Sequence, residues 1–239
     1  MTSPIEAVAV IGPPACGKST LTARWKEGGA RTVFRLSAHI YARARTDPGL
    51  RAAIEATTDP LGWLPDAVVC PLVQAALAHP GYSPAPGARL LMENYPGTAA
   101  QARHLSGLLP GRLAALELVL PPGAEEQRAA QRRVCGTCEP DPLQDPRSPA
   151  AFSVTAGLDE HCVACGSPVT ARPSDRPELL ARRVQRYREN SPAIRSAFAS
   201  ADVRVHRIDA SAPPADVAEQ ARAALAGHTV PAPPAPTGK

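Results

Sequence analysis

GPPACGKST, from Gly12 to Thr20, is the stretch of this 239-residue chain that decides the fold. It follows an apolar run, residues 5–11, and matches the pattern G-x-x-x-x-G-K-[ST] in the order strand, glycine-rich turn, helix start. Gly12 and Gly17 permit tight turns that point backbone N–H groups at phosphate oxygens, and the next helix adds its positive N-terminal end. The stretch therefore predicts a phosphate-binding loop, the alternative being a Gly/Pro turn between a strand and a helix.

The loop assigns two roles directly. Lys18 is expected to reach the β- and γ-phosphates of a nucleoside triphosphate, and the Ser19 hydroxyl to ligate a magnesium ion. The residues predicted to surround the triphosphate are Gly12, Pro13, Pro14, Ala15, Cys16, Gly17, Lys18, Ser19 and Thr20.

Composition limits the classes of protein that fit. Hydrophobic residues make up 44% and charged residues 20%, which is a globular profile. A net charge of +4 does not suggest a nucleic-acid-binding surface. The first apolar run is too short for a signal peptide, and no segment approaches the ~20 apolar residues of a membrane helix. We expect a cytoplasmic protein with neither nucleic acid nor membrane as partner.

Apolar periodicity predicts alternating strands and helices. The predicted strands are 5–11, 32–36, 88–93, 113–120 and 203–208. The predicted helices are 20–27, 37–45, 50–57, 67–78 (with Asp66 as cap), 98–109, 125–134, 177–187 and 217–225. This order predicts an α/β fold with a central parallel β-sheet flanked by helices and with ligands at the carboxyl ends of the strands. Residues 135–171 are expected to be loop-like, and 230–239 to be a disordered Pro/Ala tail.

The cysteines form two C-x-x-C pairs, Cys135 with Cys138 and Cys162 with Cys165. Four thiolates so arranged predict a tetrahedral zinc site, and because no coordination position stays open, the metal would be structural. Paired disulfides, unpaired thiols at a coincidental spacing, and iron or an iron–sulfur cluster are the alternatives. His161 adjoins the second pair and is interpreted as a bystander.

Arginines flank this cluster on both sides. They are Arg128, Arg132 and Arg133 before it, and Arg172, Arg182 and Arg183 after it. Phosphoryl transfer needs positive charge fixed around phosphates and the exclusion of water, which a zinc-braced flap carrying arginines would supply. A solvated basic helix face is the alternative.

Further motifs occur in a recognisable order along the chain. They are RLSAHIYAR (35–43), MENYPGTAAQA (92–102), RRVCGTC (132–138), CVACGSPVTARPSDRPELLARRVQRY (162–187) and VHRIDAS (205–211). With the phosphate loop, this series resembles adenylate kinase, a nucleoside monophosphate kinase, in its zinc-binding long-lid form. The resemblance covers nearly the whole chain except the tail.

The resemblance implies a P-loop NTPase fold with three parts. The core would comprise residues 1–36, 81–127 and 173–229, the helical acceptor (NMP)-binding insertion 37–80, and the zinc-binding lid 128–172. It also implies an enzyme that transfers a phosphoryl group from ATP to AMP or another nucleoside monophosphate, with magnesium and a structural zinc ion. Members of this form are usually monomers.

The resemblance implies roles residue by residue. Lys18 and Thr20 fall on ATP phosphate contacts, and Arg128 on the arginine beside the ATP base. The arginines around the transferred group would be Arg132, Arg172 and Arg183. The acceptor-side residues would be Ser37, Arg43, Gln101, Arg172 and Arg183, and Glu93 would join Ser19 at magnesium.

Two departures lie on the acceptor side. The family usually has D-G-F-P-R after the third strand, and its arginine contacts the acceptor phosphate. Here residues 93–97 read E-N-Y-P-G, so Gly97 stands in place of that arginine. Residues 38–40 read A-H-I in place of the usual T-G-D. These departures leave open a kinase of the same fold with a changed acceptor, such as a modified nucleotide or a phosphorylated pathway intermediate. A non-catalytic nucleotide-binding regulator is the third alternative.

Overall fold

The computed structural model describes residues 3–4, 6–27, 32–83, 88–135, 137, 161–162, 165–226 and 229–230. Its centre is a parallel five-stranded sheet in the order β3-β4-β2-β5-β8. The strands are β2 (Ala7–Ile11), β3 (Thr32–Arg35), β4 (Leu90–Glu93), β5 (Leu113–Val119) and β8 (Val205–Asp209). The predicted parallel sheet is confirmed, and β2, the strand before the phosphate loop, lies at its middle.

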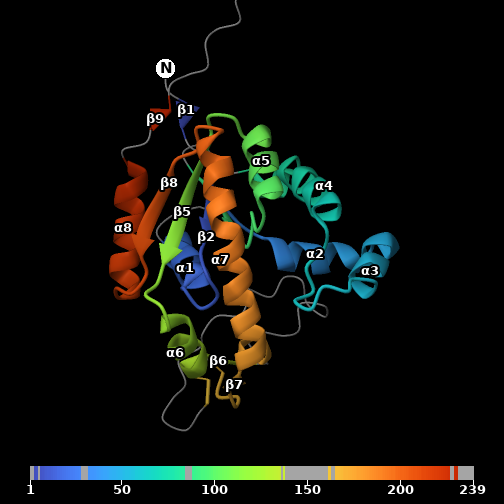
Figure 1. Cartoon of the computed structure of the whole chain (residues 1–239), viewed down its shortest axis with the longest axis vertical. Helices are drawn as coiled ribbons and strands as arrows, with labels where there is room; N and C mark the ends of the chain where they lie inside the picture. The colour runs from blue at the N-terminus through green and yellow to red at the C-terminus, as the bar shows by residue number, and fades with distance from the viewer. Residues whose placement is uncertain are drawn as a thin grey trace, which may run out of the picture.

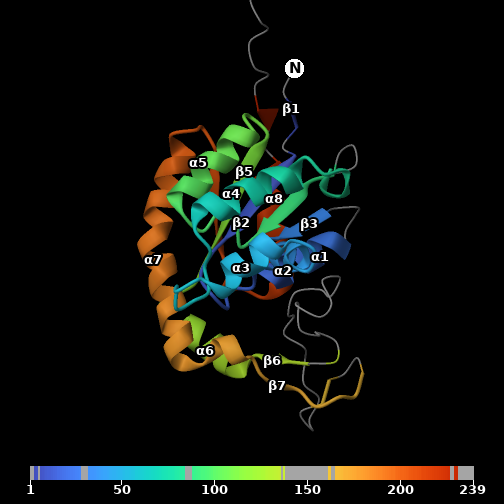
Figure 2. The ribbon, with the colours of Figure 1, turned by 90° about the vertical axis from the view of Figure 1, so that its right-hand side faces the viewer.

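Helices cover both faces of the sheet (Figures 1 and 2). In β2, Ala7, Ala9 and Ile11 pack into one cluster, while Val8 and Val10 pack into the other, as the two-residue period of a strand requires. The first cluster includes residues of α4 (Asp66–Leu77), α5 (Ala99–Leu108) and α7 (Pro177–Ala199), and the second those of α1 (Lys18–Glu27) and α8 (Pro214–Ala226). Both faces are buried, which explains the continuous apolar runs of the strands.

A helical excursion separates β3 from β4. It contains α2 (Leu36–Ala44), α3 (Pro48–Glu55), α4 and the short 3-10 helix η1 (Pro80–Tyr82). Asp47 caps α3 by accepting the backbone N–H of Leu50 at 3.0 Å. The expectation that Asp66 caps α4 is wrong: Pro65 holds the cap position and Asp66 lies in the first turn, where its carboxylate is used elsewhere.

The second correction concerns α7. The predicted helix 177–187 continues to Ala199, through Pro192. A proline inside a helix removes one hydrogen bond and costs ~3 kcal/mol. Ile194 and Phe198 lie beyond it and are both buried, so the apolar surface they remove from water offsets that cost.

The elements between β5 and α7 lie beyond the carboxyl ends of the strands (Figures 1 and 2). They are α6 (Ala124–Gln131), an antiparallel pair of β6 (Arg133–Val134) with β7 (Thr170–Ala171), and η2 (Pro173–Asp175). The predicted helix 125–134 therefore ends early, and the loop expected up to residue 171 ends in a strand. Residues 138–160 lie outside the described part of the chain.

The two ends of the chain meet in a second small pairing. β1 (Ser3–Pro4) runs antiparallel to β9 (Thr229–Val230), so Val230, placed by the sequence in the tail, belongs to a strand. Residues 231–239 lie outside the described residues. Among the described helices, none combines the length and the apolar character needed to cross a bilayer.

The core allows a stability test on α5. Leu105 is fully buried, so Leu105→Ala leaves a cavity and is expected to lower the free energy of unfolding by ~2–5 kcal/mol. Arg103→Ala, on the exposed side of the same helix, is the control and is expected to change it by less than ~0.5 kcal/mol. Urea unfolding measures both variants, and equal losses would contradict the placement of α5.

Candidate functional site

The phosphate loop depends on glycine at its first position. Gly12 has φ +151°, and a Cβ there would lie 2.7 Å from Cys16 Sγ and 2.8 Å from the Leu118 carbonyl oxygen. Gly17, at φ +94°, precedes the first residue of α1, Lys18. Backbone strain and lack of space thus exclude a larger residue at position 12, and the turn leads directly into the helix N-terminus as predicted.

Lys18 folds back over this loop. Its Nζ donates to the carbonyl oxygens of Gly12 at 2.8 Å and Pro13 at 2.9 Å, and lies 3.7 Å from Cys16 Sγ. The ammonium group therefore lies at the entrance of the loop. A bound anion would replace the two carbonyl oxygens as its hydrogen-bond partner. Of the other predicted loop residues, Pro14 lines the adjoining cavity, and Ser19 and Thr20 lie in the first turn of α1.

Glu93 is a buried carboxylate at the end of β4, opposite Val10 of β2. It accepts hydrogen bonds from Ser19 Oγ at 2.9 Å and from Thr22 Oγ1, and it pairs with Arg35 Nε at 3.2 Å. The two residues predicted to hold magnesium, Ser19 and Glu93, are thus brought together. A buried charge is costly unless paired, and three partners from two elements satisfy this one.

Two of the arginines that flank the cysteine cluster converge on a carboxylate that the sequence reasoning missed. Arg132 donates to both oxygens of Asp175, at 2.6 Å and 2.5 Å, and this pair is largely buried. Arg183 lies 3.4 Å from Asp175 Oδ1 and also donates to the Ser174 carbonyl at 3.0 Å. The only sequence signal for Asp175 is its place shortly after Arg172, so its role becomes visible only when the segment is folded.

Arg172 and Arg183 both line the large cavity described below. Burial lowers the pKa of Arg183, and the nearby charge of Arg172 lowers it further, while Asp175 opposes the shift. An arginine remains protonated despite such a shift. The cluster therefore holds partly buried positive charge in excess of the one carboxylate, an arrangement suited to an anion.

The acceptor-side residue Gln101 has both ends of its amide occupied. Its Nε2 donates to Asp66 Oδ1 at 2.7 Å, and its Oε1 accepts from the Gly97 backbone N–H at 2.7 Å. Thr98 Oγ1 donates to the other oxygen of Asp66 at 2.9 Å. Ser37 lines the cavity, whereas Arg43 is exposed on α2 and is not among the cavity-lining residues.

Trp63 occupies the space beside Gly97. A Cβ placed on Gly97 would lie 3.0 Å from Cη2 and Cζ3 of the indole ring. The volume into which a side chain at position 97 would extend is therefore filled by an aromatic ring. Sequence reasoning missed Trp63, because nothing local links the loop that carries it to residue 97.

One cavity of about 510 Å³ joins these groups. Its wall includes Gly12 and Lys18 of the phosphate loop, Arg172 and Arg183, and Trp63 of the helical excursion. Arg128 is not among the lining residues; it lies on α6, where its Nη2 donates to the Ala210 carbonyl at 2.6 Å. Lys18, Arg172 and Arg183 supply the cations of the wall, and the helical excursion supplies mainly apolar and aromatic side chains.

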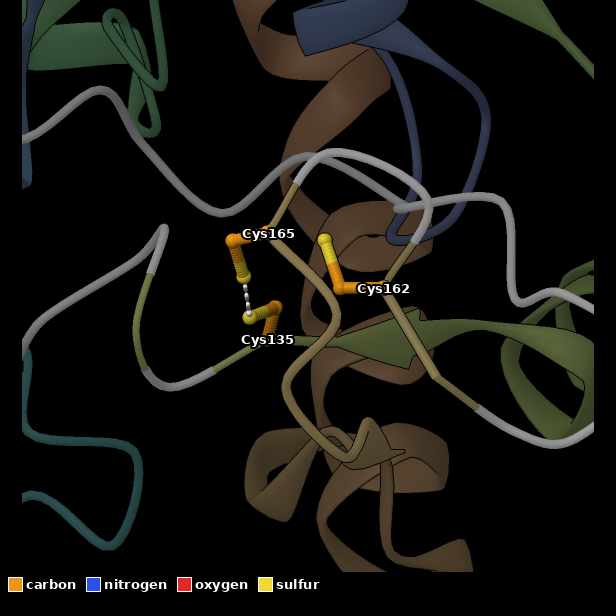
Figure 3. Close-up of side chains that lie close together, drawn as sticks. All are labelled: Cys135, Cys162 and Cys165. Atoms are coloured by element: carbon orange, nitrogen blue, oxygen red, sulfur yellow. Dashed lines mark hydrogen bonds between the residues drawn. The ribbon is translucent and has the colours of Figure 1, made fainter.

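Three of the four predicted zinc ligands lie together (Figure 3). The sulfur atoms of Cys135, Cys162 and Cys165 lie within 4.8 Å of one another, with Cys135 and Cys165 at 3.5 Å. Next to this cluster, the backbone N–H of Cys162 donates to the Ser167 carbonyl oxygen at 2.8 Å. Cys138 lies outside the described residues.

Comparisons with known proteins agree with this geometry. An adenylate kinase of Gloeobacter violaceus is 30% identical over 210 residues, covering 78% of this chain and 84% of the relative. An adenylate kinase of Geobacter sulfurreducens is 28% identical over 88% of this chain and 93% of the relative. An adenylate kinase of Salinispora tropica is 26% identical over 93% of this chain and 99% of the relative. No protein-family model matches the chain.

The loop geometry leads to a matched glycine test. Gly12→Ala brings a Cβ against Cys16 and the Leu118 carbonyl, so we expect the affinity for ATP to fall at least about tenfold, or ~1.4 kcal/mol. Gly107→Ala, in α5 with no atom near the added Cβ, should bind ATP unchanged and gain ~0.5–1 kcal/mol of stability. Calorimetric titration with ATP measures the affinity, and equal affinities for the two variants would refute the role of Gly12.

Proposed function

Because this chain belongs to the adenylate kinase family, we propose that it transfers the γ-phosphoryl group of ATP to AMP. The chain is a phosphotransferase, and its relatives support a nucleoside monophosphate as acceptor. The observation that carries the proposal is the single cavity in which Lys18 of the phosphate loop faces Arg172 and Arg183, with Gln101 also in its wall. A donor and an acceptor can meet there, with positive charge between them.

The donor half binds ATP through the loop. Backbone N–H groups of the loop, which Pro13 and Pro14 lack, would hold the phosphates together with the ammonium of Lys18, and Arg128 would lie beside the base. Ser19 and Glu93 would hold magnesium, since a hydroxyl and a buried carboxylate 2.9 Å apart at the end of a strand are hard oxygen ligands. When bound, magnesium supplies positive charge that neutralises the phosphate oxygens.

Transfer needs positioning and charge rather than a covalent step on the protein. An oxygen of the acceptor phosphate bonds to the γ-phosphorus as the bond to the bridging oxygen of ADP breaks, so the acceptor becomes a diphosphate. Arg132, Arg172 and Arg183 stabilise the charge on the transferring group. Asp175 keeps Arg132 and Arg183 in place through its two oxygens.

Each of the three proposed segments has its own role in the reaction. Residues 1–36, 81–127 and 173–229 form the core, residues 37–80 bind the acceptor through Ser37, Arg43 and Gln101, and residues 128–172 form the lid. Closure of the lid over the phosphates would exclude water, which strengthens each ionic contact and prevents hydrolysis of ATP.

A second candidate is the same reaction with a changed acceptor. The supporting observation is the ring of Trp63 beside Gly97, because it fills the space that the family's arginine would need to contact an acceptor phosphate. The exposed position of Arg43, away from the cavity, points the same way. A modified nucleotide or a phosphorylated intermediate would fit a pocket that relies less on phosphate contacts.

Zinc would brace the lid. Tetrahedral bonds of ~2.3 Å put thiolate sulfurs roughly 3.8 Å apart, and the three described thiols already lie within 4.8 Å of one another. A disulfide would need sulfurs about 2.05 Å apart, whereas Cys135 and Cys165 are 3.5 Å apart. We assign Cys135, Cys162 and Cys165 as ligands, with Cys138 as the fourth.

An acceptor panel with purified protein, ATP and magnesium tests the reaction. We expect AMP to be converted to ADP, and Lys18→Ala to lower kcat by at least roughly 100-fold. Arg183→Ala should lose a similar factor because it removes charge at the transferring group, while Arg182→Ala, on an exposed position of the same helix, should stay within about twofold.

The panel separates the alternatives. Turnover of no nucleoside monophosphate above the Lys18→Ala background would contradict the proposal. Transfer to another phosphorylated acceptor only would favour the second candidate. Loss of activity in Arg182→Ala equal to that in Arg183→Ala would refute the role given to the cavity-lining arginine.

Metal analysis tests the zinc site. The purified chain is expected to carry about one zinc ion, and Cys162→Ser to lose it together with part of its thermal stability, because a structural site contributes folding energy. Cys70→Ser, in α4 and outside the cluster, is the control and should keep its zinc. Unchanged zinc content in Cys162→Ser would refute the assignment.

A further inference from the structure

Trp63 is the one exposed large hydrophobic side chain among the residues that the structure describes, with 38% of its surface accessible. A large aromatic ring left open to solvent at the wall of a cavity is typical of a contact surface for a ligand. The ring lies beside Gly97 and lines the same cavity as the phosphate loop. The exposed ring is therefore a candidate contact for a ligand in this cavity.

Contacts fix the ring before any ligand arrives. The Arg186 guanidinium lies over the ring, 4.8 Å from its centroid, and Arg186 is itself paired with Asp59 at 2.7 Å. Asp59 Oδ1 also accepts the backbone N–H groups of Leu61 at 2.8 Å and Trp63 at 3.3 Å. Because Arg186 is not among the cavity-lining residues while Trp63 is, the cation covers the ring from outside the cavity.

The helical excursion contributes mostly apolar side chains and no cation to the described cavity wall, and Ser37 and Tyr41 are its polar members there. Gln101, one of the predicted acceptor-side residues, has both ends of its amide hydrogen-bonded, to Asp66 and to Gly97. The cationic residues of the described cavity wall are Lys18, Arg172 and Arg183, and none of them comes from the helical excursion that carries Trp63. Leu64 and Val69 of the excursion line the same cavity. The excursion thus offers an aromatic surface in place of a cation.

We propose that Trp63 is the specificity-determining platform on which the planar base of the acceptor stacks, and that this contact replaces the arginine–phosphate contact missing at Gly97. The inference rests on the proposed transfer to a nucleotide acceptor and names the part of the acceptor that this chain recognises. Stacking tolerates every base, because every base has an aromatic face, while it rejects a sugar phosphate that has no base.

The two tryptophans make a direct binding test possible. Trp25 is 1% exposed in the core, so quenching of fluorescence by a small ligand reports Trp63. AMP and CMP, added without ATP, are expected to quench the emission saturably, and ribose 5-phosphate is expected not to. Equal quenching by AMP and ribose 5-phosphate, or AMP quenching that persists in Trp63→Phe, would overturn the inference.

Kinetics give a second measurement. Trp63→Leu is expected to raise KM for the nucleotide acceptor about ten- to hundredfold, with kcat and KM for ATP within about threefold of the original values. Trp63→Phe, which keeps an aromatic face, should recover most of the loss. Unchanged acceptor KM in Trp63→Leu would overturn the inference, and unchanged ATP KM shows that the variant is folded.

These readouts separate the inference from the proposed function. Nucleotide transfer with an unaltered KM in Trp63→Leu leaves the kinase proposal standing and removes the stacking platform. Base-dependent quenching through Trp63 without transfer to any nucleotide leaves the platform standing and removes the proposed reaction.

Discussion

The buried carboxylate of Glu93 is the group on which the organisation of the site depends. It ends β4 beside the central strand, and hydroxyl groups of α1 and the Arg35 side chain of β3 satisfy its charge. An unpaired carboxylate there would cost several kcal/mol, so these partners fix the start of α1 relative to the sheet. The phosphate loop and the end of β4 are thereby held in one rigid frame, which is what a preorganised anion site requires.

Charge is distributed unevenly along the cavity that this frame opens into. Lys18, Arg172 and Arg183 supply the positive charge of the cavity wall. Asp175 binds Arg132 and Arg183 and thereby holds both guanidinium groups in one place. Trp63 and apolar side chains of the helical excursion line the same cavity. In the proposed reaction, electrostatic attraction would act on the transferring phosphoryl group, and non-polar contact would act on the rest of the acceptor.

The sequence predicts what depends on neighbours along the chain. The phosphate loop, the alternating strands and helices and the cysteine knuckles all carry local patterns, and the parallel sheet follows from them. Contacts between residues far apart in the sequence account for the wrong predictions. Aspartate is a residue type that often caps helices, yet the Asp66 carboxylate accepts hydrogen bonds from Gln101 and Thr98. The predicted helix 177–187 is too short, because Ile194 and Phe198, beyond Pro192, pack against the core and the helix continues to Ala199. Domain boundaries and residue roles in catalysis remain predictions.

The acceptor end illustrates why a missing residue is hard to interpret from sequence. From the sequence alone, Gly97 in place of an arginine indicates a lost contact with the acceptor phosphate. The fold shows that the Trp63 ring lies in the space beside Gly97, where Arg186 and Asp59 hold it. Exchange of an ionic contact for a stacked one changes the nature of recognition, since salt screens charges at an exposed site but leaves apolar burial in place. The departures in the acceptor motif are therefore coupled: glycine at 97 is what makes room for the ring at 63, and an arginine could return only if the tryptophan moved.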